Sequence, residues 1–174
     1  MRAFLKGFLI GTAYICALAL IWICFARPKM TAHEADVLKT EYTQPSPGAV
    51  RSGAGLLPAE KESAPALDFG ALRVFFPDVR AWLTIPGTVA DYPVLQSSPE
   101  NPEYYLRRNF RGEWRMAGSL FFQADCSPDG RCLIVYGHNM ADGTMFGCLP
   151  NYLDAGYCAS HKMIRLETPD GVRE

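Results

Sequence analysis

The chain has 174 residues, of which 49% are hydrophobic and 20% are charged, and its formal net charge is −1. This apolar content excludes a disordered chain, and the near-neutral charge gives no electrostatic basis for nucleic-acid binding. Six cysteines in a chain of this length are too few for a small disulfide-dense domain. The length allows one folded domain with additional segments.

An uncharged apolar run near the N-terminus, residues 8–26, predicts a single transmembrane helix. At 1.5 Å per residue the run reaches about 28 Å, close to the thickness of the hydrocarbon core of a bilayer. A cleaved signal peptide is the alternative, but its apolar region normally has only about 7–15 residues. Basic residues flank the run on both sides, so the charges do not give its orientation. We therefore assign residues 1–29 to an N-terminal membrane anchor.

Residues 30–67 predict a flexible linker. Four prolines and three glycines lie between Thr43 and Pro65, and the apolar residues there show almost no periodic pattern. Such a composition is typical of spacers that do not build a core.

The following residues, 68–174, predict one domain made mainly of short strands. Asp68 is a suitable N-cap for a short helix that Pro77 ends. Strands are expected at residues 81–86, 92–96, 119–123, 132–136 and 163–167, and short helices at 102–108 and 145–152. Many short strands between turn residues favour a barrel or a sandwich. Since only about five strands are present, we expect an incomplete sheet or one that another chain completes.

The pattern of strands and turns indicates His138 as a candidate catalytic residue. His138 follows the apolar run 132–136 and Gly137, so it lies at the rim of the predicted sheet. An imidazole accepts or donates a proton near neutral pH, which suits general acid–base catalysis. On this pattern alone, a structural or merely exposed histidine remains the alternative.

Several blocks of this region resemble the class B sortases. The blocks are residues 82–88, 91–96, 104–106, 118–121, 136–140 (YGHNM), 142–143, 145–146 and 161–171. They keep the order and spacing of the family, so the resemblance is specific and covers essentially all of residues 68–174.

The resemblance implies a partial sortase-type β-barrel, with about five of the family's eight strands, behind one transmembrane helix. It implies a membrane-anchored cysteine transpeptidase that needs no cofactor. Such an enzyme cleaves a sorting signal on a secreted protein, often of the Asn-Pro-x-Thr-x type, and passes the thioacyl intermediate to an amine of a peptidoglycan precursor. The expected location is the cell membrane of a Gram-positive-type bacterium, with the domain on the extracellular face.

The family's catalytic histidine corresponds to His138, and Leu106 and Tyr136 match positions that border its substrate groove. The nucleophilic cysteine and the catalytic arginine of the family lie downstream of the last matching block. No Thr-x-x-Cys motif occurs in residues 68–174, and Arg173 comes too early to be that arginine. We therefore assign neither residue and expect a C-terminally truncated member of the family.

The cysteines of the domain are poor replacements for that nucleophile. Cys132, if it shares one strand with His138, lies about 20 Å from it, and small core residues are the default reading of Cys148 and Cys158. Cys126 and Cys132 bracket a turn, and the sequence leaves open whether they form a disulfide. The spacing of cysteines and histidines predicts no metal site.

Two other readings of the chain stay open. One is a non-catalytic, sortase-like remnant that binds a partner or a sorting peptide at the membrane. The other is one half of a split sortase that a second polypeptide completes.

Overall fold

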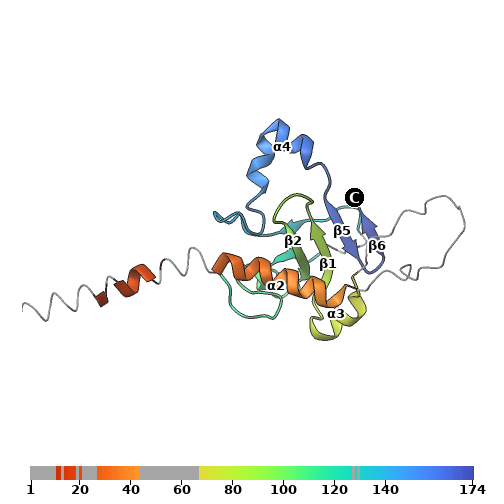
Figure 1. Cartoon of the computed structure of the whole chain (residues 1–174). Helices are drawn as coiled ribbons and strands as arrows, with labels where there is room; N and C mark the ends of the chain where they lie inside the picture. The colour runs from red at the N-terminus through yellow and green to blue at the C-terminus, as the bar shows by residue number, and fades with distance from the viewer. Residues whose placement is uncertain are drawn as a thin grey trace, which may run out of the picture.

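The computed structural model describes residues 11–12, 14–18, 20, 27–43, 67–126, 128 and 130–174. In this part of the chain the fold is mainly β with short helices, as the sequence predicted (Figure 1). The elements are α2 (Arg27–Tyr42), α3 (Phe69–Phe75), β1 (Val79–Thr84), β2 (Asp91–Gln96), the 3-10 helix η2 (Tyr104–Arg107), β3 (Leu120–Phe122), β4 (Val135–Tyr136), the 3-10 helix η3 (Leu149–Leu153), α4 (Ala155–Ser160), β5 (Arg165–Thr168) and β6 (Gly171–Arg173).

Six strands form one mixed sheet in the order β4-β3-β2-β1-β5-β6. Every neighbouring pair is antiparallel except β2 and β3, which are parallel. A parallel pair requires a crossover connection, and here residues 97–119, which include η2, supply it. Among the described residues the sheet is not closed, and β4 and β6 form its two ends.

The sheet contains β6, a strand that the sequence analysis did not predict. β6 pairs with β5 as a hairpin after Thr168, whose hydroxyl donates to the Gly171 carbonyl at 3.0 Å. The chain turns at Pro169-Asp170-Gly171 and returns beside the strand that it leaves.

β4 is shorter and more exposed than the apolar run 132–136 predicts. Only Val135 and Tyr136 are extended and paired, while Ile134 and Tyr136 are 40% and 46% exposed. The reason is the position of β4 at the end of the sheet, where it has β3 as its one neighbour. Burial on both faces, which a continuous apolar run suggests, is instead found in β3, whose three residues are all buried.

The helices after residue 68 agree with the predictions in part. Asp68 caps α3 as predicted, because its side chain accepts a hydrogen bond from the Ala71 amide at 2.9 Å. The helix expected at 102–108 is the shorter η2, and the helix expected at 145–152 is wrong in its limits. Met145 has a positive φ of 52°, which is incompatible with an α-helix, so helical structure begins only with η3 and continues in α4.

Residues 30–42, which the sequence placed in the flexible linker, are helical in α2. The helix packs against the sheet through Ala35 and Leu38, which are 3% and 2% exposed. Its apolar face is narrow, so the sequence gives little periodic signal for it. The rest of the predicted linker, residues 44–66, lies outside the described residues, and Thr43 and Leu67 on either side of it form an antiparallel bridge.

In the part of the chain that the structure describes, no helix has both the length and the apolar run that a membrane crossing requires. The predicted span, residues 8–26, lies largely outside these residues.

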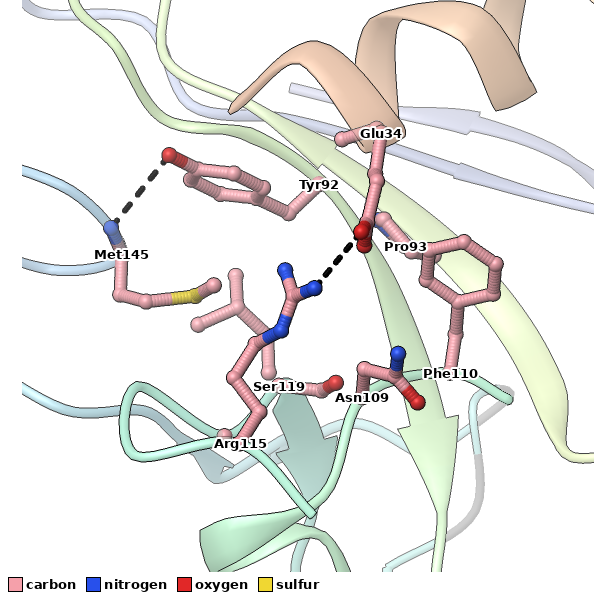
Figure 2. A pocket seen from close by; sticks show the side chains of 11 residues that line it. Glu34, Tyr92, Pro93, Asn109, Phe110, Arg115, Ser119 and Met145 are labelled. Atoms are coloured by element: carbon pink, nitrogen blue, oxygen red, sulfur yellow. Dashed lines mark hydrogen bonds and ion pairs between the residues drawn. The ribbon is translucent and has the colours of Figure 1, made fainter. Parts of the chain in front are cut away.

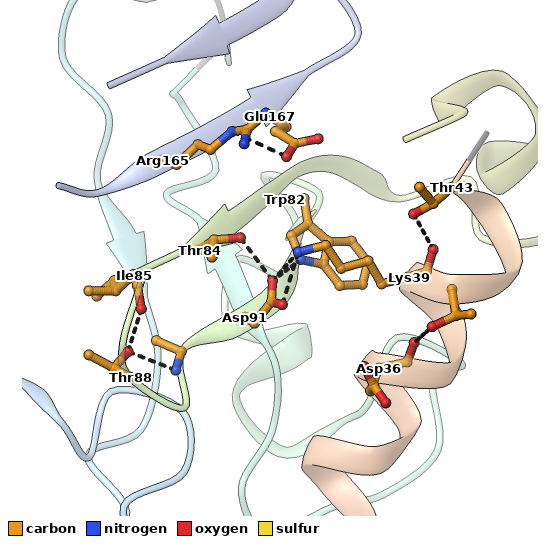
Figure 3. A network of polar contacts seen from close by, with 12 residues as sticks. Asp36, Lys39, Thr43, Trp82, Thr84, Ile85, Thr88, Asp91, Arg165 and Glu167 are labelled. Atoms are coloured by element: carbon orange, nitrogen blue, oxygen red, sulfur yellow. Dashed lines mark hydrogen bonds and ion pairs between the residues drawn. The ribbon is translucent and has the colours of Figure 1, made fainter. Parts of the chain in front are cut away.

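Asp91, the first residue of β2, fastens α2 to the sheet (Figure 3). Its Oδ1 accepts hydrogen bonds from Lys39 Nζ at 2.7 Å, Trp82 Nε1 at 2.6 Å and Thr84 Oγ1 at 2.8 Å. The Lys39 ammonium also lies 5.7 Å from the centroid of the Trp82 ring. Because Trp82 is fully buried, its indole N–H needs this acceptor. One carboxylate therefore joins the helix to the buried centre of the sheet.

Replacing Asp91 with Ala should lower the free energy of unfolding by about 1–3 kcal/mol, because Trp82 and Lys39 lose their acceptor. Asp36→Ala is the matched control, since Asp36 is an exposed carboxylate on α2, and it should change stability by less than about 0.5 kcal/mol. Urea unfolding of both variants measures the difference. Equal stabilities of the two variants would contradict the role given to Asp91.

Candidate functional site

His138 lies two residues after β4, at the start of a tight loop that returns at Met145. The backbone carbonyl of His138 accepts from the Phe146 amide at 3.0 Å, and Asn139 forms an antiparallel bridge with Met145. At the tip of the loop, Asp142 accepts from the Thr144 amide at 2.8 Å. The loop is therefore closed by its own backbone, and the Asp142 side chain stabilises the turn at its tip.

The ring of His138 is held by one backbone carbonyl. Its Nε2 lies 2.9 Å from the Leu106 carbonyl oxygen. A carbonyl oxygen only accepts hydrogen bonds, so we assign the proton to Nε2, and Nδ1 is then the acceptor of the neutral ring. Among the described residues no hydrogen bond reaches Nδ1, and the residue is partly exposed. The structure thus leaves Nδ1 available to take up or release a proton.

Leu106 belongs to η2, a short helix that is held in place by hydrogen bonds to two other segments of the chain. The neighbouring Tyr105 is 4% exposed, and its hydroxyl donates to Asp78 Oδ2 at 2.5 Å. The Tyr105 carbonyl accepts from the Ser119 amide at 3.1 Å, which ties η2 to the start of β3. The carbonyl that holds His138 is therefore presented by a fixed segment, 32 residues earlier in the chain.

Tyr136 lies on β4, two residues before His138. Its hydroxyl donates to Gln123 Oε1 at 3.0 Å, and its ring centroid is 5.6 Å from that of Phe121 on β3. No hydrogen bond or ring contact joins it to His138 or Leu106 within the described region. The structure thus brings together two of the three predicted site residues, and a substrate role for Tyr136 stays a prediction.

Gly137 allows close packing directly behind His138. A Cβ at this position would lie 2.3 Å from Leu120 Cδ2 and 2.9 Å from Phe146 Cδ2, so these two side chains would have to shift to make room for it. On the far side of the loop, the Tyr92 hydroxyl accepts from the Met145 amide at 3.4 Å, and burial raises the pKa of Tyr92. With glycine at position 137, the side chains of Leu120 and Phe146 pack directly against the backbone before His138.

Among the described residues, no cysteine forms a hydrogen bond with His138. Cys126, Cys132, Cys148 and Cys158 are all free thiols, and none of them forms a hydrogen bond with the imidazole. Cys148 is buried in the core, whereas Cys158 is exposed on α4. Since β4 contains only Val135 and Tyr136, the premise that Cys132 and His138 share one strand is wrong. Across the described ranges, no group of three or more His, Cys, Asp or Glu residues could hold a metal ion.

A small cavity lies between α2, β2, the segment before β3 and Met145 (Figure 2). Its volume is about 20 Å³, which is room for about one water molecule. Glu34 and Arg115 cross it as an ion pair with an N–O distance of 2.7 Å, and the second carboxylate oxygen of Glu34 is buried without a hydrogen-bond partner. A cavity of this size does not hold a peptide, so its polar groups serve the docking of α2.

Two contributions to the site were not predicted from the sequence. Leu106 was expected beside a substrate groove, but the group that hydrogen-bonds His138 is its backbone carbonyl, which has no side-chain signature. Tyr105 was given no role, although its hydroxyl fixes the same segment through Asp78. The aromatic pair Tyr104-Tyr105 was the one available signal, and a pair of tyrosines does not say which of them is buried.

The described fold and sequence are similar to those of known proteins, although no family model matches the chain. The chain is 40% identical over 93 residues to Sortase B of Listeria monocytogenes, and this match covers 52% of the chain and 37% of the relative. It is 33% identical over 105 residues to Sortase B of Staphylococcus aureus, covering 59% of the chain and 42% of that relative. The chain thus spans about two fifths of the length of these curated relatives.

The crystal structure of sortase B from B. anthracis in complex with AAEK1 is a similar solved structure. It is 27% identical to this chain with a TM-score of 0.64, and the match covers 83% of the chain and 63% of the solved protein. The agreement extends the sequence match to a shared three-dimensional fold.

The Tyr105 hydroxyl should make stability depend on pH in the alkaline range. Burial, together with the hydrogen bond to Asp78, raises the pKa of Tyr105 well above its ordinary value of 10.0. Above pH 10 the unfolded tyrosine loses its proton while the folded one keeps it, so the folded state binds more protons and stability falls as pH rises. Below about pH 10 this contribution is complete.

Urea unfolding between about pH 8 and pH 12 measures this effect. Tyr105→Phe should be less stable than the wild type at pH 8, because Asp78 loses its donor, and should lose less stability above pH 10. Tyr104→Phe is the matched control, since Tyr104 is the partly exposed neighbour, and it should keep the wild-type slope. A wild-type slope in Tyr105→Phe would contradict the assignment.

Proposed function

We propose that this chain, which belongs to the class B sortase family, presents His138 as the proton-transfer residue of a cysteine transpeptidase. The observation that carries the proposal is the 2.9 Å hydrogen bond between Nε2 and the Leu106 carbonyl. It fixes the ring and leaves Nδ1 open to a reacting partner. The substrates we propose are secreted proteins with a sorting signal and an amine of a peptidoglycan precursor, as in the family.

The proposed reaction is acyl transfer through a thioester. A thiolate forms a bond to the carbonyl carbon of the sorting signal, the C–N bond breaks, and the imidazolium gives its proton to the leaving amine. The wall amine then attacks the thioester, releases the thiolate and returns one proton to the imidazole. Because Nε2 keeps its proton on the Leu106 carbonyl in both states of the ring, the proton that moves is the one on Nδ1.

The Leu106 carbonyl accepts the Nε2–H in both protonation states of the ring, so it can orient His138 throughout the reaction. A nearby imidazolium in turn favours the thiolate over the thiol, because it lowers the pKa of a neighbouring cysteine from about 8.5. The Leu106 carbonyl therefore orients the proton donor directly, and it affects the nucleophile indirectly through the imidazolium.

We propose further that the nucleophilic thiol and the oxyanion-binding arginine are not residues of this chain. The described cysteines support this, because none of them hydrogen-bonds His138. The open order of the described sheet also supports it, because β4, next to His138, is paired on one side. The same observations favour the second candidate function, a sortase-like protein that binds a sorting peptide without cleaving it. A membrane anchor at residues 8–26, with the domain outside the cell, remains part of this proposal.

A chimera tests the catalytic role of His138. In it, the C-terminal part of the Listeria monocytogenes relative, beyond the matched region, follows Glu174. The chain alone should not cleave an Asn-Pro-x-Thr-x peptide, because it lacks the thiol, and the chimera should cleave it. His138→Ala in the chimera should lower kcat/KM by about 10²–10⁴-fold, the contribution of a positioned acid–base group.

His161→Ala is the matched control, because His161 follows α4 and stacks on Tyr157, with 4.0 Å between the ring centroids. It should leave kcat/KM within about twofold, as expected for a group outside the reaction. Cleavage by the chain alone would contradict the proposed absence of a thiol. A folded chimera that is inactive, or that is indifferent to His138→Ala, would contradict the role of His138 and leave peptide binding as the better reading.

A further inference from the structure

Gly118 lies immediately before β3, in a backbone conformation that favours glycine. Its φ is +58°, and its amide donates to the Arg115 carbonyl at 3.1 Å. An ideal Cβ at this position would lie 2.3 Å from the Leu106 carbonyl oxygen and 2.7 Å from the Tyr105 carbonyl oxygen. Real Cβ atoms essentially never come closer than 3.0 Å to such atoms. The space beside the Leu106 carbonyl is therefore free only because residue 118 has no side chain.

The oxygen that Gly118 faces is the one that holds His138. The Leu106 carbonyl has Nε2 of the imidazole at 2.9 Å and the α-carbon of Gly118 close by. The segment around it is also tied to the start of β3, because Ser119 donates from its amide to Tyr105 at 3.1 Å and from its hydroxyl to Arg108 at 2.9 Å. The carbonyl thus has little freedom to yield to a side chain at position 118 without breaking these contacts.

The displacement that a methyl group would impose is large compared with the range of distances over which a hydrogen bond persists. The contact would have to open from 2.3 Å to at least 3.0 Å, a shift of about 0.7 Å. If the whole shift is directed away from His138, the distance from Nε2 to the Leu106 carbonyl oxygen becomes about 3.6 Å instead of 2.9 Å. At 3.6 Å a hydrogen bond is lost.

We propose that Gly118 is a positioning residue for His138, which acts through the Leu106 carbonyl; this inference rests on the proposed function. The absence of a side chain at position 118 keeps the carbonyl where it holds the Nε2–H form of the ring. With a side chain there, the ring loses its fixed acceptor, and the proton distributes between both nitrogens. The Nδ1 lone pair is then no longer aimed at one direction.

NMR of the ¹⁵N-histidine-labelled full chain in detergent micelles tests this inference without any need for activity. The wild type should show one ring form of His138, protonated at Nε2, with a proton that exchanges slowly with water. In Gly118→Ala the two nitrogen shifts should move toward an average of both forms, and the slowly exchanging proton should disappear. The His138 signals are assigned by their loss in His138→Gln.

Two further variants separate the contact from backbone strain and from misfolding. Gly112→Ala is the matched control, because Gly112 has a similar φ of +79°, and its nearest atom is the hydroxyl of the Tyr104 side chain at 3.2 Å. It should keep the wild-type signals. Gly118→Asn tolerates the positive φ but still adds a Cβ, so it should behave like Gly118→Ala. If Gly118→Ala does not fold, the ring form of His138 in Gly118→Asn tests the inference instead.

Retention of the single Nε2–H form in folded Gly118→Ala or Gly118→Asn would overturn the inference. In the chimera, Gly118→Ala should lower kcat by about 10²-fold with little change in KM, as expected for a misplaced catalytic group. If the chimera is inactive, the proposed function fails while the NMR result still stands. If His138→Ala abolishes activity but the Gly118 variants keep the ring form, the inference fails alone.

Discussion

The hydrogen bond between His138 Nε2 and the Leu106 carbonyl is the contact on which the candidate site depends. It joins the end of the outermost strand β4 to η2, two segments that are 32 residues apart in the chain. Its main effect is to position the imidazole ring, because a single hydrogen bond contributes only about 1 kcal/mol to stability. What it determines is which ring nitrogen carries a proton and which one is open. The Tyr105 hydroxyl fixes the segment that carries this carbonyl through Asp78, and Gly118 lies beside the carbonyl oxygen itself.

Local sequence signals were sufficient for much of the fold. β1, β2, β3 and β5 lie where runs of apolar residues between turn residues predicted them, within a few positions. The failures have physical causes that a local pattern does not contain. β4 is short because it has one neighbour in the sheet, and Met145 cannot start a helix because the loop after His138 turns it to a positive φ. Both depend on backbone pairing in the folded chain, with β3 in one case and with the residues around Asn139 in the other.

The sequence predicted only part of the geometry of the candidate site. It brought forward His138 as the candidate, because a histidine after an apolar run and a glycine matches a motif of the class B sortases. It predicted Leu106 as a residue that borders the substrate groove, which stays a prediction; the contact with His138 is made by the Leu106 backbone carbonyl, which no side-chain pattern indicates. Gly118 was one letter in a matching block, and its importance follows only from the distance to an oxygen of another segment. Helix α2 was missed because the groups that dock it, Asp91 and Arg115, are 52 and 81 residues away from their partners.

A high-resolution crystal structure of the full chain would show whether the Leu106 carbonyl holds the imidazole of His138. We expect His138 Nε2 to lie within about 2.7–3.2 Å of the Leu106 carbonyl oxygen, and no sulfur of this chain to lie at hydrogen-bond distance from Nδ1. An imidazole turned away from Leu106, or a cysteine sulfur of the same chain beside Nδ1, would contradict it.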